Sequence, residues 1–352
     1  MTSLEKQLDA LSADAAPELA ESLDGNKVRC HACGHECIVA PGKRGICGMR
    51  FNMDGRLRVP SGYAAGIACD PIEKKPFFHV LPGANALSFG MLGCNFHCPF
   101  CQNWVSSQTL RDSSAKPSFT EITAQEIIHL AMRHRAKIVS STYNEPLITS
   151  EWAVEIFKLA RENHLLCSYV SNGYASPRVI EFLQPWLKCF KVDLKCFNDA
   201  SYLKWGGVLK DVCDTIVMLK ERGFWVEIVT LLIPGINDEP LELNSLARFI
   251  ASISPDIPWH VTAYHDNYHM RGHGSTPVST LVRAAEIGRK AGLHFVYAGN
   301  LPGQTGSLEN TCCHKCGGLL IERRGFRVLR NELDSHGRCP KCGVLIPGVW
   351  RW

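Results

Sequence analysis

The sequence lacks any long apolar run. No stretch approaches the roughly 18 consecutive apolar residues that a membrane-spanning helix needs, so we expect no membrane segment. The first residues are charged and mildly amphipathic and show no apolar signal core, which predicts a cytoplasmic protein. The sequence also has no large excess of positive or negative charge, since the formal net charge is +4 over 352 residues. So small an excess gives no reason to expect a nucleic-acid or membrane partner.

Cysteine, in contrast, is abundant. The chain has 17 cysteines, and most of them stand in three tight groups. Disulfides are typical of short secreted chains, whereas grouped cysteines in a long chain without a signal segment indicate metal binding in a reducing compartment. We therefore interpret each group as a candidate metal site.

The first group follows the spacing C-x2-C-x3-C-x9-C, with glycines between its four members, Cys30, Cys33, Cys37 and Cys47. Four thiolates separated by glycine-rich turns can close a tetrahedral zinc site, and so short a segment needs such a staple to fold. An iron–sulfur cluster is the alternative, although the spacing differs from that of bacterial ferredoxins. Free structural cysteines are a third interpretation. We favour zinc and leave the identity of the metal open.

The last group consists of two C-x2-C-G turns that are separated by 22 residues and contain Cys313, Cys316, Cys339 and Cys342. Paired turns of this kind are typical of zinc ribbons and rubredoxins, and the residues between them alternate enough to form a hairpin. We expect structural zinc here in preference to a single iron. The adjacent Cys312 is interpreted as a bystander.

The middle group has only three cysteines. Cys94, Cys98 and Cys101 follow the spacing C-x3-C-x2-C, with the aromatic Phe100 just before the last. A [4Fe-4S] cluster normally takes four cysteines, so three would leave one iron open. A zinc knuckle would use paired C-x2-C turns, and an ordinary ferredoxin would supply a fourth cysteine nearby.

Strand-like and helix-like segments alternate from about residue 84 to residue 300. Short apolar strands are expected at 137–142, 166–170, 190–194, 225–232, 259–263 and 295–298, with helical patterns between them. Such alternation predicts parallel strands joined by crossover helices. Six or seven units are fewer than the eight of a closed barrel, so we expect an α/β fold with an open, partial (β/α)6 TIM-like barrel. Its chemistry should gather at the carboxyl ends of the strands.

These features divide the chain into five expected parts. They are a leading helix and linker over 1–27, a four-cysteine metal knuckle over 28–58, a connector over 59–83, the barrel over 84–300 and a zinc-ribbon or rubredoxin-like module over 311–350. Lys74 and Lys75 of the connector are interpreted as solvated. The sequence thus concentrates the expected chemistry in the barrel.

The three-cysteine segment with its aromatic resembles the signature of the radical S-adenosylmethionine (SAM) superfamily. The resemblance implies that Cys94, Cys98 and Cys101 hold a [4Fe-4S] cluster whose open iron binds the amino and carboxylate groups of SAM. It also implies that Phe100 lies against the adenine. Reductive cleavage of SAM would then give a 5′-deoxyadenosyl radical, which abstracts hydrogen from a substrate that the sequence does not identify.

Contacts to SAM are implied at two strand ends. The superfamily often has a Gly-Gly-Glu segment whose carboxylate holds the ammonium group of SAM, and this chain keeps Glu145 but replaces the glycines with Tyr143 and Asn144. The short polar side chains of Ser171 and Asn172 could bond the ribose hydroxyls or the methionine carboxylate. A plain Asn-Gly turn is the alternative at the second segment.

Charged residues end the strand expected at 190–194. By resemblance to glycyl-radical activating enzymes, Asp193 and Lys195 reach the SAM or substrate pocket. We expect the acid and the base on opposite faces of the strand, because strand side chains alternate. A buried ion pair at the rim of the barrel is the alternative.

A narrower resemblance covers about residues 28–350. Several spaced segments are similar to those of the AmmeMemoRadiSam system radical SAM enzymes, relatives of pyruvate formate-lyase activating enzymes: the first cysteine group, 143–146, 226–235, 258–262, 297–300 and 346–350. The resemblance implies a low-potential electron donor of the flavodoxin or ferredoxin type, and a protein substrate or AmmeMemo-type companion. A small-molecule substrate stays open. A non-catalytic metalloprotein, either an electron carrier or a zinc-ribbon binding module, is the alternative function.

Overall fold

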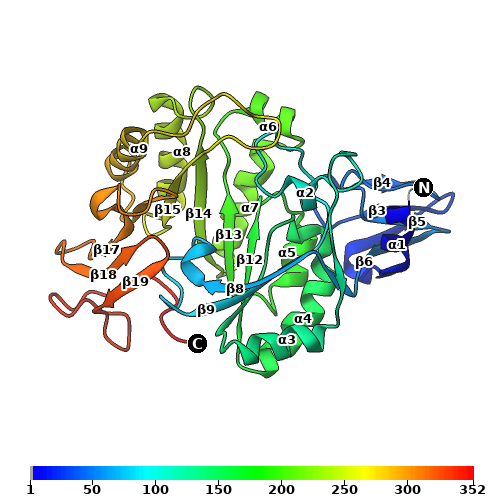
Figure 1. Ribbon diagram of the computed structural model, residues 1–352, viewed down its shortest axis with the longest axis horizontal. Helices are drawn as coiled ribbons and strands as arrows, with labels where there is room; N and C mark the ends of the chain where they lie inside the picture. The colour runs from blue at the N-terminus through cyan, green and yellow to red at the C-terminus, as the bar shows by residue number, and fades with distance from the viewer. Residues whose placement is uncertain (1–2) are drawn as a thin grey trace.

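One open sheet forms the centre of the molecule (Figure 1). The computed structural model describes residues 3–352. Eight strands pair in the order β16-β15-β14-β13-β12-β11-β9-β8. In chain order they are β8 (Gly66–Pro71), β9 (Asn85–Gly90), β11 (Ile138–Ser141), β12 (Leu166–Ser171), β13 (Cys189–Asp193), β14 (Trp225–Leu232), β15 (Trp259–Ala263) and β16 (Val296–Gly299).

Seven of these strands, β9 to β16, run parallel to their neighbours. Their crossovers carry the helices α3 (Ala124–Arg133), α4 (Ser150–Glu162), α5 (Pro177–Leu183), α6 (Asp199–Trp205), α7 (Leu209–Glu221), α8 (Pro240–Ile253) and α9 (Val278–Lys290). Parallel strands with crossover helices are the α/β arrangement, and β16 and β8 stand at opposite ends of the strand order. The predicted α/β fold with an open partial barrel is confirmed.

Local signals explain where several helices begin. Thr123 and Glu126 form a reciprocal capping box at the start of α3. At α5, the Ser176 hydroxyl accepts a hydrogen bond from the Val179 N–H, and proline occupies the first helical turn. The sequence patterns do not predict α6, because the seven residues that follow its Asn198 cap are too few to show a clear helical period.

The expected connector over 59–83 takes part in two sheets. It contains β7 (Tyr63–Ala64), and β8 pairs antiparallel with β9 over six residues. A second short pair joins β7 to β10 (Thr120–Glu121). Because β9 would otherwise be the edge of the sheet, β8 supplies hydrogen-bond partners that this edge needs.

The chain before the barrel forms two small antiparallel sheets, seen at one end of the molecule in Figure 1. Residues 12–23, expected as linker, contribute strands to both, because β2 turns back at Gly25 and pairs with β3. The helix α1 precedes these strands, and α2 lies in the loop after β9. Their bounds are α1 (Ser3–Ala10), β1 (Ser12–Asp14), β2 (Ala20–Leu23), β3 (Lys27–Cys30), β4 (Ile38–Val39), β5 (Phe51–Met53), β6 (Arg56–Pro60) and α2 (Trp104–Ser107).

The chain after the barrel forms a third small sheet, of β17 (Thr311–Cys312), β18 (Leu319–Arg324) and β19 (Arg327–Asn331). It lies at the opposite end of the molecule from the N-terminal sheets (Figure 1). One apolar cluster joins it to the barrel and includes Phe78, Phe295 and Tyr297. Among residues 3–352, no helix is long and apolar enough to cross a membrane.

Candidate active site

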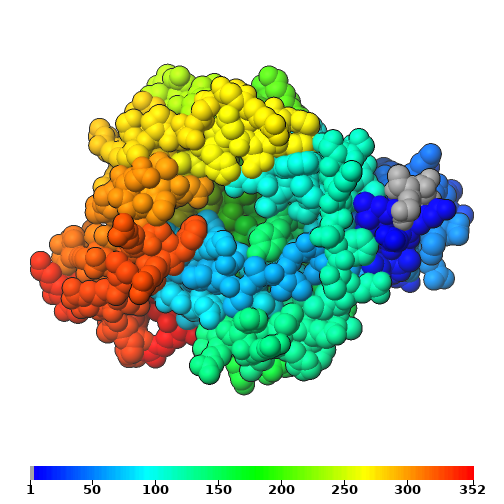
Figure 2. Space-filling view, in the orientation of Figure 1, coloured from blue at the N-terminus to red at the C-terminus, as the bar shows by residue number. Residues whose placement is uncertain are grey.

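A cavity of about 360 Å3 opens at the carboxyl ends of the parallel strands. Figure 2 shows a hollow in the face of the molecule, with green barrel segments at its base. Its size lies within the range of small-molecule sites, about 300–1,000 Å3. Every parallel strand, or the loop that follows it, contributes at least one wall residue: Cys94, Thr142, Ser171, Asp193, Leu231, Thr262 and Asn300.

All three cysteines of the middle group line this cavity. The loop that carries them leaves β9 through Gly93, which adopts a φ of +88°. A Cβ at that position would lie 2.2 Å from Met49 Cγ, so only glycine fits this turn. Among residues 3–352, no other cysteine lines the cavity.

The three thiols suit a cluster with one open iron. Burial raises the pKa of the Cys98 thiol to about 12, although the positive charge of Lys195 opposes the rise. Burial and the nearby Glu145 charge also raise the pKa of Cys94. Such thiols are neutral unless a cation compensates them, and coordination to a metal deprotonates a thiol outright. Three sulfurs in a cavity without a fourth cysteine fit the donor set that the superfamily resemblance implies.

Glu145 presents a buried carboxylate to the cavity. It accepts hydrogen bonds from the Ser171 hydroxyl at 2.6 Å, the Asn172 N–H at 2.8 Å and the Leu147 N–H at 3.1 Å. Burial raises the pKa of its carboxyl to about 7 in spite of these bonds. Glu145 therefore titrates near neutral pH, and a cationic ligand would favour its charged form.

Tyr143 and Asn144, the residues in place of the family glycines, have different roles in the fold. Tyr143 adopts a φ of +74°, the left-handed conformation that glycine favours. Asn144 accepts a hydrogen bond from the Met91 N–H at 3.0 Å and so ties its loop to the end of β9. The backbone thus keeps a glycine-like path here without a glycine.

Asn172 joins the strand end to the cysteine loop. Its amide nitrogen donates to Asn95 Oδ1 at 2.7 Å, and its amide oxygen accepts from the Tyr174 N–H at 3.0 Å. Ser171, beside it, already donates to Glu145. Both residues line the cavity, and their contacts to SAM stay predictions.

Asp193 and Lys195 both line the cavity, so the expectation that they point to opposite faces is wrong. Residues two apart on a strand share a face. The Lys195 ammonium lies 3.5 Å from the Asp193 carboxylate, and Lys191, on the same face, forms a second and closer ion pair with it. Burial raises the pKa of Asp193, but the two lysines outweigh this effect and hold it below its usual range.

The expectation that Lys75 is solvated is also wrong. Its side chain is 4% exposed and lines the cavity, whereas that of the neighbouring Lys74 is 48% exposed. Lys75 donates to the Tyr143 hydroxyl at 3.1 Å and lies 3.5 Å from Asp70. Its burial depends on a partner 68 residues away, which no local pattern reveals. Lys191 could have been found, because the period of two already places it with Asp193.

Phe100 is buried on the cavity wall and meets the Trp205 ring edge to face, with 5.0 Å between the ring centroids. Trp205 ends α6, the helix that the sequence patterns do not anticipate. This packing holds the Phe100 ring in place. The proposed contact of Phe100 with adenine stays a prediction.

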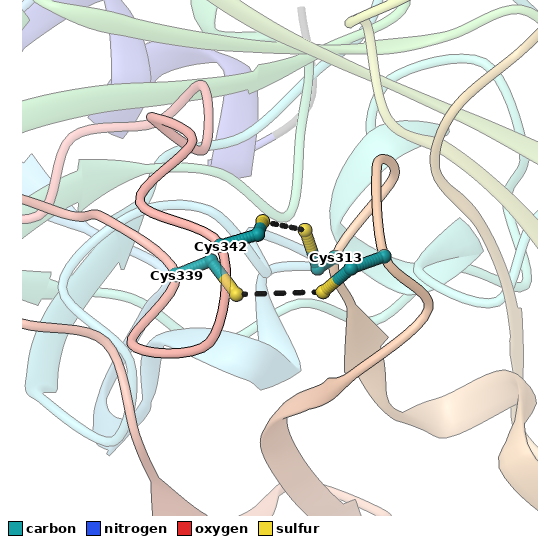
Figure 3. Close-up of side chains that lie close together, drawn as sticks. Cys313, Cys339 and Cys342 are labelled. Carbon is teal, nitrogen blue, oxygen red and sulfur yellow. Dashed lines mark hydrogen bonds between the residues drawn. The ribbon is translucent and has the colours of Figure 1, made fainter.

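The other two cysteine groups lie outside the cavity. In the C-terminal group, Cys313 and Cys342 have their sulfurs 3.6 Å apart and Cys316 and Cys339 3.7 Å apart (Figure 3). All four sulfurs lie within 4.8 Å of one another, so this group could hold a metal ion. In the N-terminal group, Cys30, Cys33 and Cys47 are buried, and Cys37 is partly exposed.

Comparisons with known proteins agree with this site. The family model of the radical SAM superfamily matches residues 90–247. An uncharacterized protein of Methanocaldococcus jannaschii is 36% identical over 329 residues, which cover 93% of this chain and 97% of that protein. The isethionate sulfite-lyase activating enzyme of Oleidesulfovibrio alaskensis is 24% identical over 124 residues, which cover 34% of this chain and 40% of that enzyme.

Among solved structures, a radical SAM methyltransferase from Sphaerobacter thermophilus is similar with a TM-score of 0.48 and 18% identity, over 68% of this chain and 71% of that one. The family match spans the cysteine loop and the carboxyl ends of β11, β12, β13 and β14, which line a large part of the cavity. The chain therefore belongs to the radical SAM superfamily.

Proposed function

We propose that the chain is a radical SAM enzyme of the AmmeMemoRadiSam type, working in a reducing compartment such as the cytoplasm. The observation that carries this proposal is that three thiols, those of the buried Cys98 and the partly buried Cys94 and Cys101, meet the buried Glu145 carboxylate in one cavity. Thiolates suit an iron–sulfur cluster, and a carboxylate suits the ammonium group of SAM. When bound, the cluster supplies the electron that cleaves SAM to methionine and a 5′-deoxyadenosyl radical.

The residues of the chain position and shield the reactants. Cys94, Cys98 and Cys101 would hold the cluster, and Glu145 would bind the SAM ammonium. Ser171 and the Asn172 N–H fix the orientation of that carboxylate through hydrogen bonds of 2.6 and 2.8 Å. A carboxylate without these hydrogen bonds would rotate. Because they hold the Glu145 carboxylate in one orientation, it can orient the ligand without a further loss of side-chain conformational entropy.

Asp193 and Lys195 line the cavity together with Lys191. We propose that Asp193 accepts a hydrogen bond from SAM or from the substrate, while the two lysines keep it ionised. Phe100, fixed by Trp205, would cover the adenine. Water exclusion by these walls protects a radical from side reactions.

The hydrogen donor is either a partner protein, as for an activating enzyme, or a small molecule. Similarity to the isethionate sulfite-lyase activating enzyme supports the first class, and a cavity of small-molecule size supports the second. A low-potential flavodoxin or ferredoxin would supply the electron. Transfer of deuterium from a labelled candidate into 5′-deoxyadenosine would separate the two classes.

The enzyme proposal is tested by the Cys98→Ala variant. After anaerobic reconstitution and reduction with dithionite, the wild type should release 5′-deoxyadenosine from SAM, and the variant should release none. Cys213→Ala, a partly exposed cysteine on α7, is the matched control and should keep the wild-type rate. Release of 5′-deoxyadenosine by the Cys98 variant would refute the assignment, and its absence in the wild type would favour a non-catalytic metalloprotein.

A further inference from the structure

The two outer cysteine groups differ in how closely their sulfurs gather. A tetrahedral ion with metal–sulfur bonds of about 2.3 Å places its sulfurs about 3.8 Å apart. The C-terminal group has this spacing, with pairs at 3.6 and 3.7 Å. Within residues 3–352, it is the one group of His, Cys, Asp or Glu ligand atoms that gathers within 4.8 Å. The N-terminal cysteines therefore do not show single-ion spacing.

Neighbouring segments nevertheless bring these N-terminal cysteines together at one centre. The Cys30 N–H donates to the Cys37 carbonyl at 2.9 Å. Burial raises the pKa of Cys33, and the charges of Cys30 and Cys47 raise it further. Thiolates bound to different irons of a cluster lie farther apart than thiolates on one ion, because the metal atoms separate them. Four neighbouring thiols whose sulfurs do not all gather within the 4.8 Å of the C-terminal group fit a cluster better than a single zinc ion.

Arg50 is a buried cation beside this centre. Its side chain is 1% exposed, and its two terminal nitrogens pair with Glu151 at 2.7 and 2.6 Å. Its Nε has no hydrogen-bond partner. The Arg50 carbonyl accepts a hydrogen bond from the Gly45 N–H at 2.9 Å, and a Cβ on Gly45 would lie 3.5 Å from Cys37 Sγ, so Arg50 lies beside this cysteine group. Its charge also opposes the rise that burial causes in the pKa of Cys30. Buried donors are almost always satisfied, so an acceptor is missing at this position.

Asn95 is a second buried donor at the same centre. It is fully buried, and its Nδ2 also has no hydrogen-bond partner. Sulfur atoms of an iron–sulfur cluster accept hydrogen bonds of this kind, and such bonds tune the reduction potential.

Asn95 also contacts one cysteine of the three-cysteine site. It directly follows Cys94, whose sulfur lies 3.8 Å from Asn95 Oδ1. Its main-chain oxygen lies 3.2 Å from the ring nitrogen Nε2 of His35, a residue between Cys33 and Cys37. One buried amide thus stands between the two cysteine groups.

We propose that Cys30, Cys33, Cys37 and Cys47 hold a second multinuclear iron–sulfur cluster, hydrogen-bonded by Arg50 and Asn95, and that Asn95 links it to the three-cysteine site. The first part does not depend on the proposed function. The link to a catalytic cluster rests on it.

The test uses the full chain, reconstituted anaerobically with ferrous iron and sulfide. The Cys94→Ala/Cys98→Ala/Cys101→Ala variant should keep about four irons and four sulfides per chain, with an electron paramagnetic resonance signal after reduction. It should also keep about one zinc, at the C-terminal group. Retention of about two zinc ions without sulfide would overturn the proposal.

A second variant guards against misfolding of the triple variant. Cys30→Ala/Cys33→Ala in the otherwise unchanged chain should lower the iron content from about eight to about four, because two cysteines cannot hold the cluster, whereas Cys213→Ala should leave it unchanged. An unchanged iron content in Cys30→Ala/Cys33→Ala would contradict the proposal. These metal counts need no SAM, so failure of SAM cleavage with both clusters present would refute the proposed function alone.

The role of Asn95 has its own readout. In the triple variant, a further Asn95→Ala change should shift the resonance signal and the reduction potential of the remaining cluster. Asn85→Ala, at the far end of β9, is the control and should leave both unchanged. If Asn95→Ala changes neither quantity, the proposed hydrogen bond is wrong.

Discussion

At the scale of single residues, Tyr143 shows how the site tolerates a departure from the family pattern. A φ of +74° costs a non-glycine residue about 1–2 kcal/mol. The side chain supplies contacts that offset this cost, because its hydroxyl accepts from Lys75 and the Lys75 ammonium lies 4.7 Å above its ring. Tyr143 thereby retains the backbone path and also fixes a cation on the cavity wall.

Glu145 carries the first prediction at this scale. Because burial raises its pKa to about 7, the carboxyl gains its negative charge as the pH rises from 6 to 8. If Glu145 binds the SAM ammonium, the affinity for SAM should increase about tenfold over this interval, the change in the ionised fraction of one such group. Equilibrium dialysis with reconstituted protein at several pH values measures this dependence.

Two variants complete that experiment. Glu145→Gln should bind SAM more weakly at pH 8, with an affinity that no longer follows the titration. Glu155→Gln, an exposed position on α4, should behave as the wild type does. If the affinity of the wild type for SAM is the same at pH 6 and pH 8, Glu145 does not bind the SAM ammonium.

At the scale of elements, the regular parts of the barrel could be predicted from the sequence. Apolar strands and capped helices carry local signals, and the strands expected at 225–232 and 259–263 coincide with β14 and β15. The antiparallel pairing of β8 with β9 was not predicted, because β8 is half-exposed and its pairing is a tertiary property. The partnerships of Lys75 and Asn95 were missed for the same reason, since each depends on residues distant in sequence.

The C-terminal cysteine group carries the prediction for an element. Its sulfur spacing fits one tetrahedral ion, which we propose to be zinc. Cys313→Ser should lose about one zinc per chain and lower the thermal unfolding midpoint by more than about 5 °C, because this sheet shares an apolar cluster with the barrel. Metal analysis and calorimetry measure both effects.

The neighbouring Cys312 offers a matched control for that experiment. Its thiol is partly exposed and lies outside the four-sulfur group. Cys312→Ser should therefore keep the zinc and the unfolding midpoint of the wild type. Equal zinc contents in the two variants would show that the ion, if present, has other ligands.

At the scale of the whole molecule, buried charges hold the small sheets and the connector to the barrel. Arg50 of the N-terminal part pairs with Glu151 on α4. Arg323 on β18 lies 3.4 Å from the fully buried Glu73 and donates to the Phe78 carbonyl at 2.7 Å. Such pairs contribute little net stability, but breaking one leaves an uncompensated charge. They therefore fix how the parts of the chain dock.

Glu227 on β14 is another buried charge, and it has several hydrogen-bond partners. Its fully buried carboxylate accepts hydrogen bonds from the backbone N–H groups of Phe78 and His79, both at 2.9 Å. It also accepts from the Trp225 ring at 2.9 Å and lies 2.7 Å from His260 Nε2. One side chain thus joins the connector to two strands at the end of the barrel remote from the cavity.

Replacement of Glu227 by Gln keeps its size but puts an N–H2 group where an acceptor is needed, so at least one of these buried donors loses its partner. We expect the free energy of unfolding in urea to fall by about 3 kcal/mol at pH 7.

Burial raises the pKa of Glu227, but His260 and the other donors outweigh this and hold it below 4.5. A depressed folded-state pKa stabilises the protein above the unfolded-state value, and this stabilisation is lost as the pH falls through the folded-state pKa. The difference in free energy of unfolding between wild type and Glu227→Gln should therefore be largest at pH 7 and should decrease below about pH 4. Glu155→Gln should show no such difference from the wild type. A loss of stability below about 0.5 kcal/mol at pH 7 would mean that the connector is held by its apolar contacts alone.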